Sequence, residues 1–200
     1  MSSDEPVPSA RQTELLERAY RYALEHGLSE LSLRPLATAI GSSPRVLLYL
    51  FGSKDGLVRA LLARARRDEL ALLDRLRDLT GEEGIGLAMA AEEVWSWLAA
   101  PEHRSLLTLW VEGYSRSLLD AHGPWGGFAS ETVNDWLAVL ARTQRPEERD
   151  TDTGLHHRTL VLAVLRGAML DLLATGDTER TTAAVRAQLA ALPRGPSRQV

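Results

Sequence analysis

A run of cationic side chains in the first third of this 200-residue chain is its clearest candidate for chemistry. Residues 34–67 carry seven basic side chains against one acid, Asp55. The basic residues are Arg34, Arg45, Lys54, Arg59, Arg64, Arg66 and Arg67. The formal net charge of the whole chain is −4, but phosphate binding depends on local positive potential. The run therefore indicates either a phosphate-binding surface or an ordinary solvated helix face.

Residues suited to enzyme chemistry are few. The chain has no cysteine, which excludes disulfides, thiolate zinc sites and cysteine nucleophiles. His156 and His157 are adjacent, so they cannot share one helical face as paired metal ligands would. Glycine-rich phosphate loops, Gly-x-Ser-x-Gly and His-Glu-x-x-His do not occur in the sequence. We expect no catalytic residue, no metal and no cofactor.

Helices must position the basic run. Alanine and leucine dominate, and no alternation of period two is sustained, so the sequence predicts an all-α protein. The expected helices cover residues 10–26, 33–40, 44–50, 54–79, 85–100, 104–121, 129–143, 155–175 and 178–192. The expected N-caps are Ser9, Ser32, Ser43 and Ser53. The most apolar stretch, residues 159–175, is interrupted by charges, and the N-terminus is unlike a signal peptide, so we expect a cytoplasmic protein without membrane contact.

Two short expected helices, joined by Gly41-Ser42-Ser43, have the proportions of a helix-turn-helix. The second helix of that motif enters the major groove of DNA. The expected packing residues are Leu36, Ala37, Ile40, Val46, Leu47 and Leu50. Arg45 could then bond to guanine or phosphate, Tyr49 could donate its hydroxyl, and Lys54 could hold a phosphate at a helix start. A helical corner with ordinary surface charges remains the alternative.

Residues 15–61 resemble the DNA-binding domain of the tetracycline-repressor (TetR) family. The matching features are the helix end at His26-Gly27 and the segments Leu31-Ser-Leu-Arg-Pro-Leu-Ala-Thr-Ala-Ile-Gly41, Ser43-Pro-Arg-Val-Leu-Leu-Tyr-Leu-Phe51 and Gly52-Ser-Lys-Asp-Gly-Leu57. The family's usual Leu-Tyr-x-His-Phe is here Leu-Leu-Tyr-Leu-Phe, so Tyr49 stands one place later. Because one residue rotates a helical side chain by ~100°, Tyr49 either contacts DNA or packs inside.

The resemblance implies specific DNA contacts and a domain order. It puts Ser32 and Arg34 near phosphates, starts the groove-facing helix at Ser43, Pro44 and Arg45, and sets Lys54 on a phosphate. The full set of candidates is Ser32, Arg34, Ser42, Ser43, Pro44, Arg45, Tyr49 and Lys54. Residues 9–56 would form the helix-turn-helix domain, 57–79 a connecting helix, and 85–192 an effector-binding and dimerisation domain, with the linker 80–84 as boundary. Residues 1–8 and 193–200 are expected to be flexible tails.

All five tryptophans fall within residues 85–192. Aromatic residues at helical spacing are ordinary core more often than pocket, but the resemblance implies an apolar effector cavity. Its candidate lining is Met89, Glu93, Trp97, Trp110, Tyr114 and Trp136, which would suit an aromatic or lipophilic small molecule.

The last two expected helices carry apolar and small residues suited to pairing with a second copy. The candidate interface residues are Leu162, Ala163, Gly167, Met169, Leu173, Val185 and Leu189. Packing inside the chain is the alternative for these residues. The resemblance implies a one-component transcriptional repressor that binds a palindromic operator as a homodimer and is released by an effector. An activator, a regulator with a protein partner, and a helical small-molecule binder without DNA contact remain open.

Overall fold

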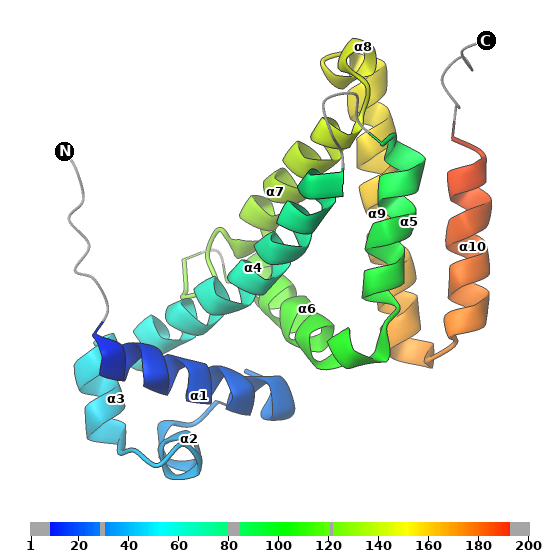
Figure 1. Ribbon diagram of the computed structural model, residues 1–200. Helices are drawn as coiled ribbons and strands as arrows, with labels where there is room; N and C mark the ends of the chain where they lie inside the picture. Colours follow the sequence, from blue (N-terminus) through cyan, green and yellow to red (C-terminus); the bar gives the residue numbers. More distant parts are fainter. Residues whose placement is uncertain (1–8, 29–30, 80–84, 121, 193–200) are drawn as a thin grey trace, which may run out of the picture. The chain divides into compact units, whose positions relative to one another are not determined.

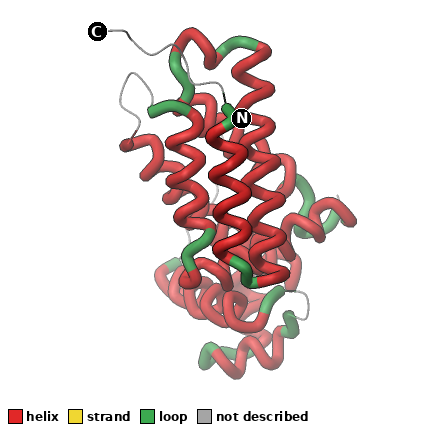
Figure 2. Tube along the Cα trace, turned by 90° about the vertical axis from the view of Figure 1, so that its right-hand side faces the viewer, coloured by secondary structure: helices red, strands yellow, loops and turns green. Residues whose placement is uncertain are grey.

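The computed structural model describes residues 9–28, 31–79, 85–120 and 122–192. The expected flexible tails and the expected linker at residues 80–84 lie outside the described residues. Helices alone make up the regular structure of these ranges, as the sequence predicts (Figure 2). Within the same ranges, no helix combines the length and apolar character that crossing a bilayer requires.

The helices follow the expected order closely (Figure 1). They are α1 (Ala10–His26), α2 (Leu33–Ala39), α3 (Pro44–Phe51), α4 (Lys54–Leu79), α5 (Leu87–Leu98), the 3-10 turn η1 (Pro101–His103), α6 (Arg104–Leu119), α7 (Phe128–Thr143), α8 (Pro146–Arg149), α9 (Asp152–Thr175) and α10 (Thr178–Ala190). Helix α8 was not expected, because four residues are too few to show a helical period. Helix α9 begins earlier than expected because the Thr151 hydroxyl accepts a hydrogen bond from the Gly154 N–H at 3.0 Å.

The described residues divide into two compact units. The N-terminal unit contains the residues up to Glu69 together with Ser105–Ala129, and the C-terminal unit contains Leu70–Arg104 and the residues from Ser130 onward. The expected domain at residues 85–192 is therefore not one compact unit, since most of α6 belongs to the N-terminal unit. Packing explains this difference, because Leu109 of α6 is buried in the same apolar core as the side chains of α1 to α4.

Two close contacts attach α6 within the N-terminal unit. The Leu28 N–H donates to the Glu112 carboxylate at 2.8 Å, which ties α6 to the chain that follows α1. Gly113 lies against Leu62 and Phe128, and a Cβ added there would come within 3.0 Å of Leu62 and 3.2 Å of Phe128. The absence of a side chain at residue 113 therefore permits the close approach of α6 and α4.

A polar network joins α1 to α4 inside the N-terminal unit. The Tyr20 hydroxyl donates to Asp68 at 2.9 Å, and the Arg64 guanidinium lies 4.6 Å from the centre of the Tyr20 ring. Arg64 also pairs with Asp68 and donates to Glu17 at 2.6 Å. Burial raises the pKa of the Tyr20 hydroxyl, and its hydrogen bond to Asp68 raises it further.

Helices α5, α9 and α10 pack against one another in the C-terminal unit. Figure 1 shows α5 and α10 running alongside α9. Their contact surfaces bury Val94, Leu165 and Val185 almost completely. The Trp95 indole N–H donates to the Thr182 hydroxyl at 3.0 Å, so this large aromatic side chain is satisfied within the core.

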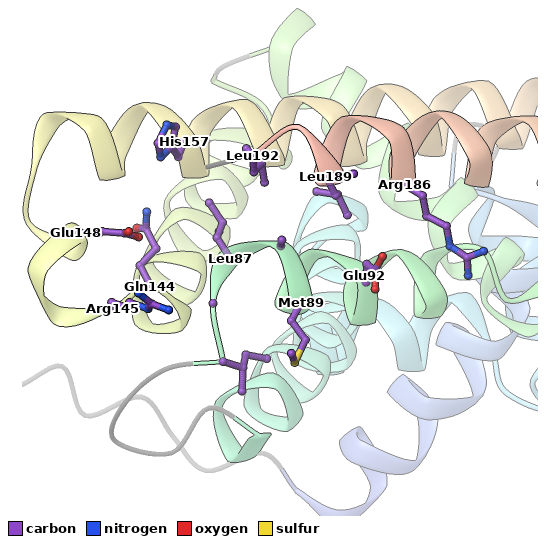
Figure 3. A pocket seen from close by; sticks show the side chains of 14 residues that line it. Leu87, Met89, Glu92, Gln144, Arg145, Glu148, His157, Arg186, Leu189 and Leu192 are labelled. Carbon is purple, nitrogen blue, oxygen red and sulfur yellow. The ribbon is translucent and has the colours of Figure 1, made fainter. Parts of the chain in front are cut away.

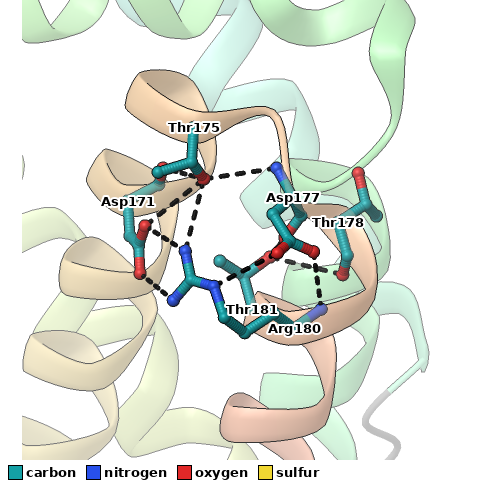
Figure 4. A network of polar contacts seen from close by, with 6 residues as sticks. All are labelled: Asp171, Thr175, Asp177, Thr178, Arg180 and Thr181. Atoms are coloured by element: carbon teal, nitrogen blue, oxygen red, sulfur yellow. Dashed lines mark hydrogen bonds and ion pairs between the residues drawn. The ribbon is translucent and has the colours of Figure 1, made fainter.

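The turn between α9 and α10 is held by a charged network (Figure 4). Arg180 donates to both carboxylate oxygens of Asp171, at 2.8 and 2.6 Å, and Asp177 caps α10 by accepting from the Arg180 N–H. Gly176 ends α9 at φ +72°, a conformation that glycine adopts without steric cost. The hydrogen bonds from Arg180 lower the pKa of Asp171, because they favour its charged form.

Candidate nucleic-acid interface

Helices α2 and α3 form the expected helix-turn-helix. The Ser42 N–H donates to the Ala37 carbonyl at 2.8 Å across the turn, and Gly41 takes φ +67°. Ser43 begins α3 by accepting from the Val46 N–H at 3.3 Å, with Pro44 at the first helical position. These local bonds confirm the predicted cap and turn.

Side chains of helix α1 form hydrogen bonds to both helices of the helix-turn-helix. The Gln12 side-chain amide donates to the Leu50 carbonyl at 3.0 Å, at the end of α3. Arg18 donates to the Ile40 carbonyl at 3.2 Å, at the end of α2. Two terminal carbonyls that lack helical partners are thus satisfied by α1, and both short helices keep a fixed orientation within the N-terminal unit.

The outer surface of α3 is formed by Arg45, Val46, Leu48 and Tyr49, which are all exposed, whereas Leu47 is buried. Tyr49 is 85% exposed, so the alternative that it packs inside is wrong. The expectation that Val46 packs inside is also wrong, because this side chain is 37% exposed. At ~100° per residue, Val46 lies between the exposed Tyr49 and the half-buried Leu50, so it stands at the edge of the packing side of the helix.

The basic run separates into free and paired cations. Arg34, Arg45 and Lys54 are exposed, and none of them forms an ion pair with a described residue. Arg64, in contrast, is held by Glu17 and Asp68 in the internal network. The Glu17 contact could not be predicted from the sequence, because Glu17 lies 47 positions away from Arg64, whereas Asp68, four residues after Arg64, was a signal of pairing that the sequence offered.

The serine candidates differ in their availability. Ser32 is exposed at the N-cap of α2, and its hydroxyl makes no capping bond. The Ser43 hydroxyl is partly occupied by its bond to the Val46 N–H. The Ser42 oxygen is buried and has no hydrogen-bond partner among the described residues, so this side chain does not belong to the exposed surface. Ser53 caps α4 by accepting from the Gly56 N–H at 2.9 Å, which sets Lys54 in the first helical turn.

The six expected effector-lining residues are divided between the two units. Trp110 and Tyr114 stack with ring centres 4.9 Å apart and pack on the core of the N-terminal unit. The other four lie in the C-terminal unit, where Met89 and Glu93 are exposed, Trp97 stacks on His103 at 3.9 Å, and Trp136 is buried. No single described pocket brings the six together.

A pocket of about 510 Å³ opens in the C-terminal unit (Figure 3). It has an apolar side formed by Leu87, Met89, Leu189 and Leu192, and polar or charged side chains around it. The latter are Glu92, Gln144, Arg145, Glu148, His157 and Arg186. Only Met89 was expected here, because the lining comes from four helices and the α7–α8 connection, and the spacing within one helix does not reveal such a meeting. The part of the chain that the structure describes contains no cluster of side chains suited to holding a metal.

The expected interface residues are also divided. Leu162, Met169, Val185 and Leu189 are buried inside the chain, which is the intramolecular packing that the sequence also allowed. Ala163 and Gly167 are exposed, and Leu173 is half-buried. Other exposed apolar residues of α9 lie on the same stripe as Ala163 and Gly167, namely Leu160, Leu170 and Ala174.

Known proteins share this sequence and fold. Residues 15–61 match the family described as bacterial regulatory proteins, tetR family. Over 177 residues the chain is 28% identical to the HTH-type transcriptional repressor AcnR of Corynebacterium efficiens, covering 88% of this chain and 87% of AcnR.

Solved structures of similar fold cover nearly the whole chain. A structure of the multidrug binding protein EbrR complexed with imidazole has a TM-score of 0.65 at 24% identity, covering 92% of this chain and 91% of that one. A TetR-family member from Streptomyces coelicolor A3 has a TM-score of 0.67 at 22% identity, covering 91% and 97%. At these identities the solved structures show the fold of the chain alone. Residues 15–61 are therefore a helix-turn-helix domain of the tetR family, and the chain as a whole is similar to TetR-family transcriptional regulators, which bind DNA.

Proposed function

We propose that this regulator is a repressor that binds a palindromic operator as a homodimer and is released by a small aromatic or lipophilic effector. The observation that carries the proposal is the exposed surface of α3, where Arg45 projects without an ion-pair partner among the described residues. A free guanidinium can form two parallel hydrogen bonds to guanine in the major groove. The relationship to AcnR, which is named as a repressor, supports this outcome over activation.

The proposed DNA contacts fall into two kinds. Ser32, Arg34 and Lys54 would bind backbone phosphates, which supplies affinity and sets the register of the protein on the duplex. Ser43, Pro44, Arg45 and Tyr49 would lie in the major groove at the start and along the outer side of α3. We leave Ser42 out of the proposed contacts because its hydroxyl oxygen is buried.

A palindromic operator has two half-sites, and a homodimer would supply a second copy of α3 for the second half-site, about 34–36 Å from the first. The proposed contact surface is the exposed stripe of α9 formed by Leu160, Ala163, Gly167, Leu170 and Ala174. These positions recur every three to four residues and therefore lie along one side of the helix. Helix α10 also has exposed small side chains, the alanines at residues 183, 187 and 190. Small side chains permit close helix approach, which supports this stripe over the buried leucines.

The proposed effector would act from the C-terminal unit. EbrR structures hold imidazole or proflavin, which supports a compact aromatic ligand for this chain as well. The pocket that contains Met89 is one candidate site, and the surroundings of Trp97 in the same unit are the other. Helix α4 contributes residues to both units, so an effector that prefers one disposition of the units would change operator affinity. We place this activity in the cytoplasm, where the DNA is.

Operator binding is tested by selecting duplexes from a random pool with the full-length protein at low salt. We expect enrichment of an inverted repeat with half-sites one helical turn apart or a multiple of it. The proposal is overturned if the protein binds all duplexes equally, or if the enriched sequence is bound equally well by an Arg45→Ala variant that unfolds at the wild-type temperature.

Effector release is tested with proflavin as the probe. We expect proflavin to quench tryptophan fluorescence and to weaken binding to the selected duplex. The variants Met89→Ala and Trp97→Ala separate the two candidate sites, because each should weaken proflavin binding only if its own site is used. Exposed Ala138 of α7, changed to serine, is the control. Binding of proflavin without any change in DNA affinity would reject this ligand as a model effector.

A further inference from the structure

The outer surface of α3 has few side chains that can form hydrogen bonds. Its exposed side chains after the proline are Arg45, Val46, Leu48 and Tyr49, so the guanidinium and one phenolic hydroxyl are its only side-chain hydrogen-bonding groups. Two backbone N–H groups at the start of the helix are already used, since those of Val46 and Leu47 donate to Ser43. Reading several base pairs by hydrogen bonds alone therefore exceeds what this helix offers.

Apolar surface takes the place of these missing polar groups. Val46 is 37% and Leu48 is 41% exposed, and the Tyr49 ring is 85% exposed. At ~100° per residue, Leu48 and Val46 lie on opposite sides of Arg45, with Tyr49 between Arg45 and Val46. Around the exposed arc of α3, the arginine thus has Leu48 on one side, and Tyr49 and Val46 on the other.

The major-groove edges of the four bases contain one apolar group, the C5 methyl of thymine. Val46 and Leu48 present branched methyl groups, which can contact that methyl and exclude water from it. Resting on the proposed operator binding, we infer that α3 reads thymines on both sides of an Arg45-bound guanine through Val46 and Leu48. The partner of this surface is accordingly a DNA duplex whose half-site places thymine methyl groups beside guanine.

Recognition of thymine methyl groups differs from recognition by charge and hydrogen bonds in one measurable property. Replacing a thymine by deoxyuridine removes the C5 methyl and leaves every hydrogen-bonding group in place. A helix that reads bases only through Arg45 would be indifferent to this change. A helix that reads methyl groups loses apolar contact at each affected position.

The test uses the duplex selected above, with each thymine replaced singly by deoxyuridine. We expect at least two positions in each half-site at which wild-type affinity falls roughly four-fold, the factor for one apolar carbon removed from contact. Leu48→Ala and Val46→Ala should each abolish this sensitivity at one of the positions, while Val46→Thr, which keeps one methyl, should retain part of it. Leu119→Ala is the matched control, because Leu119 is 84% exposed on α6 of the same unit.

The outcomes separate this inference from the operator proposal. If the protein binds its selected duplex and Arg45→Ala weakens that binding, but no deoxyuridine changes affinity by more than about two-fold, the inference is wrong and operator binding stands. The inference is also wrong if folded Val46→Ala and Leu48→Ala proteins keep the full methyl sensitivity. If no duplex is preferred at all, operator binding fails and the inference fails with it.

Discussion

The cations of the proposed DNA surface differ in what their chemistry can recognise. The planar guanidinium of Arg45 can bond to two atoms of one guanine, whereas the ammonium of Lys54 is a compact charge with no such geometry. Their positions agree with this difference. Arg45 is on α3, the helix proposed to enter the major groove, and Lys54 is in the first turn of α4, where a phosphate is proposed to bind. We therefore assign specificity to Arg45 and general affinity to Lys54.

Substitution of these two residues should have different consequences. Arg45→Ala should weaken binding to the selected duplex by roughly 5- to 150-fold for each half-site contacted, with little effect on unrelated duplexes. Lys54→Ala should weaken binding to all duplexes similarly and lower the salt slope by about 0.9 per lost phosphate contact, or roughly two for a dimer. Fluorescence anisotropy at several salt concentrations measures both effects. Arg142→Ala, an exposed arginine of α7, is the control, and equal effects of the Arg45 and Lys54 variants would contradict the assignment.

Tyr20 should make the stability of the protein depend on alkaline pH. Its pKa in the folded protein is raised above the ordinary value of 10.0 by burial and by Asp68. Its contribution is therefore complete below pH 10 and declines as the pH rises above 10, where the unfolded chain releases the proton first. Tyr20→Phe should lose about 1 kcal/mol at neutral pH and show a smaller decline between about pH 10 and about pH 11.

Urea unfolding at several pH values measures this difference. Tyr49→Phe is the control, because Tyr49 is on the exposed surface of α3 and makes no described contact with the core. Parallel pH profiles for the wild type and Tyr20→Phe would show that the Tyr20 hydroxyl does not cause the decline.

At the scale of elements, α6 is the helix whose placement matters most for the DNA-binding unit. Its Glu112 accepts from the Leu28 N–H, which lies between α1 and the helix-turn-helix. Gly113, the next residue, allows α6 to approach α4 at Leu62. A displacement of α6 would therefore disturb the support of the DNA-binding surface at two adjacent points.

Removing the Glu112 carboxylate should weaken that support. Glu112→Ala leaves the partly buried Leu28 N–H without this acceptor, and we expect the free energy of unfolding to fall by about 1–3 kcal/mol. Glu112→Gln keeps an acceptor oxygen and should lose less. Urea denaturation measures the change, and hydrogen exchange at the Leu28 amide shows whether it is local. Unchanged exchange in Glu112→Ala would mean that the bond does not hold this segment.

At the scale of the whole molecule, the proposed dimer depends on the exposed stripe of α9. A Cβ added at Gly167 would meet no atom of the chain within 4 Å, so substitution there should not disturb the folded subunit. Replacing a glycine within a helix also favours the helix by roughly 0.5–1 kcal/mol. A larger residue at this position should therefore act on assembly alone.

Gly167→Glu should convert the dimer to a monomer, because two like charges would meet at the proposed close contact. Light scattering should then give a mass near 22.0 kDa in place of about twice that value. The variant should also lose most of its affinity for the palindromic duplex while retaining the wild-type helical signal. Ala138→Glu, an exposed small residue of α7, is the control. A monomeric wild type at micromolar concentration would refute the dimer.

Local sequence signals accounted for most of the helical framework. Ser9, Ser43 and Ser53 cap their helices as predicted, because a serine hydroxyl needs only a backbone N–H three residues away. The short helix α8 was not predicted, because its four residues are too few to show a helical repeat of apolar positions. Assignment of α6 to the N-terminal unit also escaped it, because the deciding contacts join residues far apart in the chain, such as Leu28 and Glu112.

The amino-acid sequence by itself determined the all-α fold, the helix-turn-helix and the resemblance of residues 15–61 to the TetR family, since each follows from patterns within a few helical turns. Only the tertiary structure decided which side chains of those helices are free to act. It buries Leu162 and Met169, exposes Val46 and Tyr49, and pairs Arg64 while leaving Arg45 without an ion pair among the described residues. The physical reason is that periodicity orients a side chain relative to its own helix, whereas burial and pairing depend on which distant segments cover it.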